Sequence, residues 1–184
     1  MKRVLWLIPA VLLFAITAHS QERPASWEFS GEYSYLDANL NGSKFHMNGA
    51  GGTITENLNS WFGGRIEANI YQGNENVTAS GVTTKYSVNA ETLTYGPVFS
   101  YRKFSRITPF ANVQLGVIHG STNYLGISQS AFKFAAAPGG GVDFALNRRT
   151  AIRVSGEYLL TRFLRLTQEN VTASVGVILR FGTR

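Results

Sequence analysis

A period-two alternation of apolar and polar residues constrains this 184-residue chain more than any other feature. Successive side chains of a β-strand point to opposite faces, so the alternation predicts strands with one apolar and one polar face. The same stretches lack the three-to-four-residue period and the capping residues of an amphipathic helix. The sequence therefore predicts an all-β protein. Its eight predicted strands are Trp27–Leu36, Met47–Glu56, Trp61–Gln72, Tyr86–Tyr101, Ile107–Gly120, Ser130–Leu146, Thr150–Leu160 and Glu169–Phe181.

Composition excludes several classes of protein. Only 15% of the residues are charged, against about 25% in an average domain, which argues against a disordered chain or a basic nucleic-acid binder. The absence of cysteine excludes a disulfide scaffold and a cysteine-based zinc site. His46 has no clustered metal-ligating neighbours, and the glycine-rich stretches 49–52 and 139–141 lack the Lys-Ser/Thr of a phosphate-binding loop. We expect neither a metal nor a cofactor.

The first twenty residues have the pattern of a secretory signal peptide. Two basic residues, Lys2 and Arg3, precede the apolar run Val4–Ala18, and small residues at Ala18 and Ser20 predict cleavage before Gln21. The alternative is a membrane-anchoring helix, for which the apolar run is short of the ~20 residues needed. We therefore expect a signal peptide at residues 1–20 and one domain at residues 21–184.

The connections between the predicted strands alternate between short and long. Residues 57–60, 102–106 and 147–149 form short turns, whereas residues 37–46, 73–85, 121–129 and 161–168 form longer polar loops. Most predicted strands also reach the ~9–11 residues needed to cross a bilayer at a tilt. Short turns at one rim and long loops at the other are typical of an outer-membrane barrel, with the long loops extracellular. This pattern predicts an eight-stranded antiparallel up-and-down transmembrane β-barrel with both termini periplasmic.

The content of each face indicates which one meets lipid. Aromatic residues near strand ends, such as Trp27, Trp61 and Tyr71, predict an outward apolar face with aromatic girdles. A soluble periplasmic barrel, with the two faces reversed, is the alternative. Charged residues of the polar face would pair inside the barrel, Asp143 with Arg153 across a turn and others where the sheet closes. The predicted lumen charge network is Glu28, Glu32, Arg65, Glu67, Asp143, Arg153, Glu157 and Arg180.

The last predicted strand carries a recognisable motif. Ser174, Gly176, Leu179 and Phe181 fit the pattern polar-x-Gly-x-x-apolar-x-aromatic, which resembles the signal that the bacterial barrel-assembly machinery reads. In this chain three residues, 182–184, follow the aromatic. Over residues 27–181 the chain resembles the transmembrane domain of the outer membrane protein A (OmpA) family. The peptidoglycan-binding domain of larger family members is not expected here, because the chain ends after the eighth strand.

The resemblance and the polar loops together predict a non-enzymatic protein of the bacterial outer membrane, with a role in envelope integrity or in surface adhesion. A lipid A-modifying hydrolase is one alternative, because His119 and Ser121 have the His-x-Ser spacing of outer-membrane lipid A deacylases. A narrow channel is the other. The expected partners are outer-membrane lipid and lipopolysaccharide, the assembly machinery and an extracellular ligand, but no nucleic acid, and we expect a monomer. Basic residues on the predicted periplasmic turns are Arg102, Lys103, Arg106, Arg148 and Arg149.

Overall fold

The structure is a computed structural model that describes residues 24–40, 43–79, 82–124, 127–163 and 166–182. The predicted signal peptide, residues 1–20, lies outside these ranges. Within them, no helix is both long enough and apolar enough to cross a membrane. What these ranges describe is a sheet.

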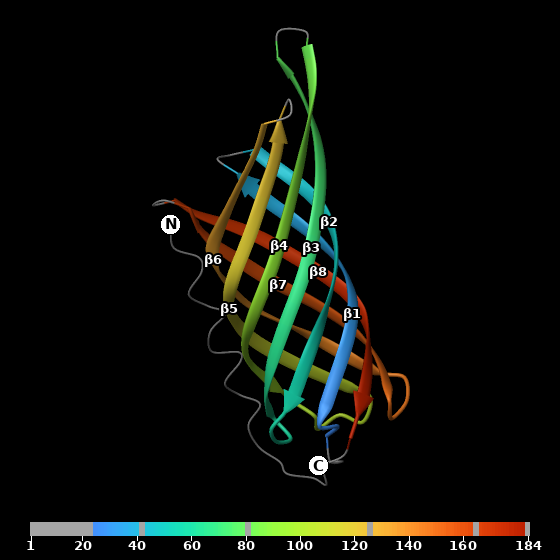
Figure 1. Ribbon diagram of the computed structural model, residues 1–184. Helices are drawn as coiled ribbons and strands as arrows, with labels where there is room; N and C mark the ends of the chain where they lie inside the picture. Colours follow the sequence, from blue (N-terminus) through green and yellow to red (C-terminus); the bar gives the residue numbers. More distant parts are fainter. Residues whose placement is uncertain (1–23, 41–42, 80–81, 125–126, 164–165, 183–184) are drawn as a thin grey trace, which may run out of the picture.

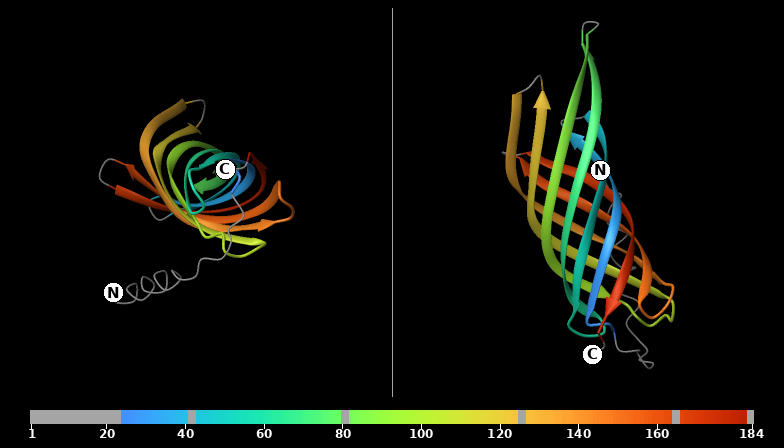
Figure 2. Two further views of the ribbon diagram at one scale, coloured as in Figure 1. Left: turned by 90° about the horizontal axis from the view of Figure 1, so that it is seen from below. Right: turned by 45° about the vertical axis from the view of Figure 1, so that its right-hand side comes forward.

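Eight antiparallel strands follow one another around a closed barrel in chain order (Figure 1). β1 pairs with β8 from Trp27↔Phe181 to Asp37↔Val171, which closes the ring. The view from below in Figure 2 shows the strongly tilted strands encircling one axis. The predicted eight-stranded antiparallel barrel is therefore confirmed. Its strands are β1 Trp27–Leu40, β2 Ser43–Asn57, β3 Phe62–Ala79, β4 Val82–Ser100, β5 Ile107–Tyr124, β6 Ile127–Ala145, β7 Thr150–Phe163 and β8 Leu166–Phe181.

The short connections gather at the end of the barrel that also holds the start of β1 and the end of β8, here called the turn end (Figure 1). Asparagine side chains order two of these turns. The Oδ1 of Asn59 accepts hydrogen bonds from the backbone N–H groups of Trp61 (2.9 Å) and Phe62 (2.8 Å). Asn147 does the same for Arg149 (2.8 Å) and Thr150 (2.9 Å). Asparagine favours such turns because its side chain mimics a backbone acceptor.

At the opposite end, here called the hairpin end, the prediction of four long loops is wrong. Strands continue through most of these residues, and only positions 41–42, 80–81, 125–126 and 164–165 separate them. The pairing of β3 with β4, for example, runs unbroken to Ala79↔Val82. β-branched residues such as Val77 and Thr83 favour strands. The sequence of these segments does not alternate between apolar and polar residues, because the part of the sheet beyond the apolar belt has no face to bury.

The outer face of the barrel is apolar over a limited height. On β3 the outward positions run from Phe62 to Ile70, and the next one, Gln72, is polar. Eight steps of about 3.3 Å at a tilt of about 40° span about 20 Å. With the side chains at each end, this approaches the ~25 Å apolar band of an outer-membrane barrel. Ile66 and Ile70 on this face are exposed, whereas Arg65 and Glu67 are buried, so the apolar face points outward, as the sequence predicts.

An arginine on this face provides a test of its contact with lipid. Val175, near the middle of β8, is 48% exposed, and we expect Val175→Arg to lower the free energy of unfolding in phospholipid vesicles by about 2–4 kcal/mol. Asn89→Arg, outward on β4 but beyond the apolar belt, should cost at most about 1 kcal/mol. Urea unfolding followed by tryptophan fluorescence measures both. Equal losses for the two variants would contradict the lipid-facing assignment.

Candidate functional site

The lumen near the turn end is organised around Arg153 on β7. The Nε of Arg153 donates to Oδ1 of Asp143 (2.7 Å), and its Nη2 donates to Oδ2 (2.9 Å). The two residues are register partners across the β6–β7 turn, and their exposed fractions are only 1% and 3%. Such a bidentate pair satisfies both charges where the two side chains are buried. The structure thus places Asp143 and Arg153 opposite each other.

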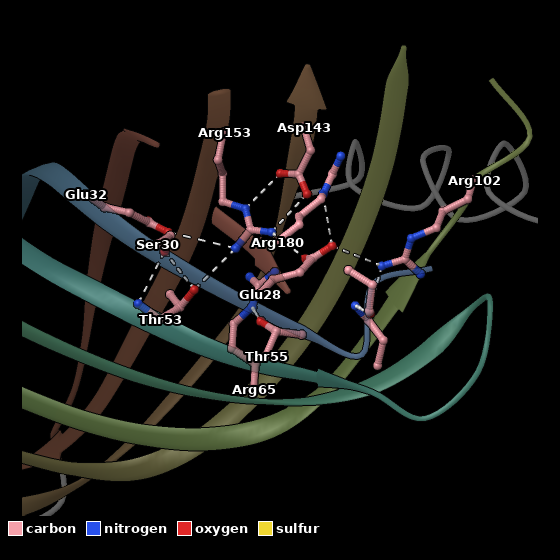
Figure 3. A network of polar contacts seen from close by, with 12 residues as sticks. Glu28, Ser30, Glu32, Thr53, Thr55, Arg65, Arg102, Asp143, Arg153 and Arg180 are labelled. Carbon is pink, nitrogen blue, oxygen red and sulfur yellow. Dashed lines mark hydrogen bonds and ion pairs between the residues drawn. The ribbon is translucent and has the colours of Figure 1, made fainter. Parts of the chain in front are cut away.

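Glu28, at the start of β1, lies among three guanidinium groups (Figure 3). Its carboxylate oxygens are 3.3 Å from Nε of Arg180, 3.6 Å from Nη2 of Arg102 and 3.7 Å from Nη2 of Arg153. Glu28 and Arg180 are register partners in the pair of strands that closes the barrel. The carboxylate therefore joins the closing strands to the rest of the network.

Arg102 enters the lumen from the turn between β4 and β5. It donates to Oδ1 of Asn57 (2.8 Å) and to the carbonyl oxygen of Ser60 (2.9 Å), so it also fastens the neighbouring turn. Burial lowers the pKa of Arg102, and the charge of Glu28 partly opposes that shift. From sequence, Arg102 was expected on the periplasmic rim. It instead turns inward, because the clustered carboxylates of the lumen attract a cation.

Phe110 on β5 provides an aromatic contact for two lumen cations. The guanidinium carbons of Arg65 and Arg153 lie 4.6 Å and 4.7 Å from the centroid of its ring. Arg65 also donates to Oγ1 of Thr55 (3.1 Å). The ring stabilises both cations through their attraction to its π face. Arg153 further approaches Glu32, with 3.8 Å between Nη1 and Oε1.

Two other lumen carboxylates are held by amides. Glu67 accepts hydrogen bonds from Asn69 (2.8 Å) and from Gln114 (3.0 Å). Glu157 accepts one from Asn112 (2.8 Å). All eight residues of the predicted charge network are therefore strand residues at inward positions, with Arg180 nearest the turn end. They form one arginine-rich group and one amide-bound group.

The lumen becomes apolar toward the hairpin end. Tyr71 was expected in the outer girdle, but it is only 2% exposed and lies in this layer. Its position on β3 has the same parity as Arg65 and Glu67, and this parity, rather than nearness to a strand end, decides which way the ring points. The side chains of the layer are Leu36, Met47, Tyr71, Ala90, Ala135, Ala137 and Leu159.

Glycines stand beside two of the inward glutamates, Glu32 and Glu157. Gly176 is the register partner of Glu32, and a Cβ added to it would come within 2.5 Å of the Glu32 Cγ. A Cβ at Gly139 would come within 2.6 Å of the Cγ of Glu157. Such contacts are shorter than packed atoms tolerate, so glycine is needed there. The glycine-rich strands thus make room for the lumen network.

The motif of the last strand divides between the two faces. Ser174 points inward and donates to the Ser34 hydroxyl (2.8 Å), and Gly176 also faces the lumen. Leu179 and Phe181 face outward, where the Phe181 ring meets the edge of Phe29 at 5.7 Å between centroids. Packing and closure therefore already require much of this pattern. Its recognition by the assembly machinery stays a prediction.

His119 and Ser121 lie on the outer face of β5, near the edge of the apolar belt. Glu91 on β4 is the register partner of His119, and its Oε2 is 3.9 Å from the His119 Nδ1. The sequence could not identify this acid, which comes from a neighbouring strand. The His119 ring also stacks on Phe132, with centroids 4.4 Å apart. The structure thus brings a carboxylate beside the histidine, at a distance longer than a hydrogen bond.

His46 occupies a similar position on β2. Its Nδ1 is 2.6 Å from the hydroxyl of Tyr35 and 3.5 Å from Oδ1 of Asp37. Across the described ranges, no group of three or more histidine or acidic side chains could hold a metal ion. His46 and Tyr35 instead form a stacked polar pair on the outer face.

The sequence matches a model of the outer membrane protein beta-barrel domain over residues 7–181. No curated protein matches it. Similar solved structures include Ail, the attachment invasion locus protein of Yersinia pestis, in complex with the heparin analogue sucrose octasulfate. That comparison gives 20% identity and a TM-score of 0.60, over 86% of this chain and 99% of that chain.

Two further structures are similar. Neisserial surface protein A is 12% identical with a TM-score of 0.67, over 87% of this chain and 100% of that chain. OprG from Pseudomonas aeruginosa is 13% identical with a TM-score of 0.53, over 89% and 99%. At identities this low, the similarity shows a shared fold only.

Removing Arg153 should leave several carboxylates in the lumen without their cationic partner. We expect Arg153→Ala to lower the free energy of unfolding by about 3–5 kcal/mol, because it leaves Asp143 buried without its partner. Arg148→Ala, in an exposed turn, should stay close to wild type. Urea titration of the refolded barrel in detergent measures the difference. In the double variant Arg153→Ala/Asp143→Ala the losses should not add. Equal midpoints for Arg153→Ala and Arg148→Ala would refute the pairing.

Proposed function

Because the chain belongs to the outer membrane protein beta-barrel domain family, we propose that it is a non-enzymatic surface-adhesion protein of the bacterial outer membrane. The observation that supports this proposal is a sheet that stands beyond the barrel ring. The pairing of β2 with β3 ends at Asn48↔Gln72, whereas that of β3 with β4 continues to Ala79↔Val82. Figure 1 shows the β3–β4 and β5–β6 hairpins rising above their neighbours.

The protruding sheet consists of four strands with two open edges. β4 and β5 pair as far as Ser87↔Asn123, and β5 and β6 as far as Tyr124↔Ile127. β6 pairs with β7 only from Ala135↔Thr161 onward, so among the described residues the preceding part of β6 is paired with β5 on one side and has no strand on the other. Unpaired strand edges bind extended peptides by adding a strand to the sheet. This edge supports a protein ligand for the adhesion role.

The same proposal fixes the orientation of the barrel. The hairpin end faces outward and both termini lie in the periplasm, because long elements are tolerated on the extracellular side and short turns occupy the other. Lipid and lipopolysaccharide surround the apolar belt of a monomer, and the assembly machinery inserts it. Ail, which is named for attachment and invasion, has a similar fold, and this likeness supports the proposed role.

A second candidate function is lipid A hydrolysis, favoured by the contact between Glu91 and His119. In a serine hydrolase the acid orients the histidine through Nδ1, and the other ring nitrogen activates the serine. Ser121 lies two residues along the same face of β5, close to the level of lipid headgroups. His119 stacks on Phe132, however, and 62% of the Glu91 side chain is exposed. Both observations favour an ordinary surface position for these residues over a catalytic one. A narrow channel is not favoured, since side chains occupy the lumen from the turn end to the apolar layer.

Trimming one hairpin tests the adhesion role. Gly73 and Val88 are register partners, so residues 74–87 can be replaced by an Asn-Gly turn. We expect cells that carry this variant to lose binding to immobilised extracellular-matrix proteins. The matched control joins Thr161 to Gln168 in the same way on the β7–β8 hairpin and should keep binding.

Two measurements make the result interpretable. A Thr84→Cys variant of this cysteine-free chain should react with an impermeant maleimide on intact cells, and detergent resistance of the cells reports envelope integrity. Binding that survives the trimming of residues 74–87 would contradict adhesion through the protruding sheet. Two results together would point to the envelope role. Wild type would show no binding, and the trimmed barrel would still restore the detergent resistance of the cells.

Mass spectrometry of lipid A separates the two candidate functions. We expect identical acylation patterns in cells that lack the protein and in cells that express wild type, Ser121→Ala or Glu91→Gln. Loss of an acyl chain with wild type but not with Ser121→Ala would establish the hydrolase. Glu91→Gln would then show an intermediate loss if the acid orients His119.

A further inference from the structure

We propose that the turn end carries a binding surface for anionic phospholipid headgroups, formed by Lys103, Arg106, Arg148 and Arg149, here called the basic turn patch. These residues lie in the connections before β5 and before β7. The proposal is independent of the adhesion role and needs only that the barrel crosses a lipid bilayer. It assigns these turns a ligand of defined chemistry, a phosphate-bearing anionic headgroup.

The charge of the two connections is of one sign. Residues 101–106 and 146–149 contain five basic residues and no acidic one. Arg102 is committed to Glu28 in the lumen, so the other four supply the surface charge. Within the described residues, no ion pair joins Arg106, Arg148 or Arg149 to a carboxylate, and all three are exposed. The third short turn, residues 58–61, contains no basic residue.

The backbone brings the two connections together. The carbonyl oxygen of Arg106 accepts a hydrogen bond from the N–H of Ala145 (2.8 Å), where β5 begins beside the end of β6. Arg148 and Arg149 follow three and four residues later. The Asn147 side chain orders their turn, and the carbonyl of Arg149 accepts from the N–H of Arg180 (2.8 Å). The cations therefore gather on one side of the rim, from β4 to β7.

Apolar side chains beside the cations place the patch at a membrane surface. Phe104 and Leu146 project from the same two connections and are 53% and 62% exposed. The ring of Tyr101 contacts the edge of Phe104 (5.6 Å between centroids), and Nζ of Lys103 lies 5.4 Å from the Tyr101 centroid. Aromatic rings and long cationic side chains occupy the boundary between hydrocarbon and headgroups. A soluble polyanion would need no such apolar neighbours.

These two properties select the headgroup. Basic clusters next to a membrane attract anionic lipids, and the attraction falls off within a Debye length in salt. A zwitterionic headgroup offers its phosphate with a compensating amine and gains less. Phosphatidylglycerol, with a single unbalanced phosphate charge, is therefore the appropriate probe.

Spin-labelled lipids measure this preference directly. The purified protein is placed in phosphatidylcholine vesicles, and electron paramagnetic resonance gives the association of spin-labelled phosphatidylglycerol relative to spin-labelled phosphatidylcholine. We expect wild type to favour phosphatidylglycerol several-fold. Arg106→Gln/Arg148→Gln/Arg149→Gln should reduce the ratio to about one, as should high salt. The matched triple lysine variant at the same positions should keep most of the preference.

Each outcome decides for or against the patch. Heat-dependent mobility in gels confirms that the variants are folded barrels, and lumen Arg153 is left intact in all of them. A ratio near one for wild type would overturn the proposal, as would a preference that the glutamine variant retains. Retention of soluble peptidoglycan fragments in place of the lipid would overturn it as well, and would assign the cations to a periplasmic polymer.

Discussion

The closure of β8 onto β1 is the constraint on which the rest of this structure depends. Lipid offers no hydrogen-bonding partner, so an open sheet edge within the apolar belt would leave a row of backbone groups unsatisfied. The pairing from Trp27↔Phe181 to Asp37↔Val171 removes that edge. It also sets Glu28 beside Arg180 and Ser34 beside Ser174, which hydrogen bond across the seam. Closure thus creates the polar interior.

An interior of this kind reverses the usual basis of stability. The apolar side chains are left facing lipid, and the inward face must satisfy buried charges from its own resources. Arg153 does so by reaching Asp143, Glu28 and Glu32 at once. Slipping one strand by one residue would turn such a group toward lipid, because successive side chains alternate between faces. The network therefore specifies register at the turn end, and the apolar layer around Leu36 and Met47 takes over nearer the hairpin end.

Parity explains both what the sequence predicted and what it missed. Alternation identified the strands, their faces and the eight charged residues of the lumen, since each of these follows from a period of two. Phe110 has the same parity as Asn112 and Gln114, so alternation already places it on the inward face. Because its side chain is apolar, it was not recognised as a lumen residue. Arg102 was out of reach because a turn residue has no parity. The partnership of Glu91 with His119 was also out of reach, since register between distant segments is set by turn geometry and closure rather than by local pattern.

The two ends of the barrel can differ because its stability lies between them. The ion pairs and hydrogen bonds around Arg153 and Glu67 hold the strands within the membrane, below the protruding part of β3 to β6. The parts of the strands beyond the belt do not need to bury an apolar face, so their sequence can be adapted to binding a ligand. At the turn end, Arg102 is drawn inward by Glu28, while Arg106, Arg148 and Arg149 remain on the surface. The basic residues at the turn end therefore have two roles: Arg102 helps to close the lumen, and the others face the membrane surface.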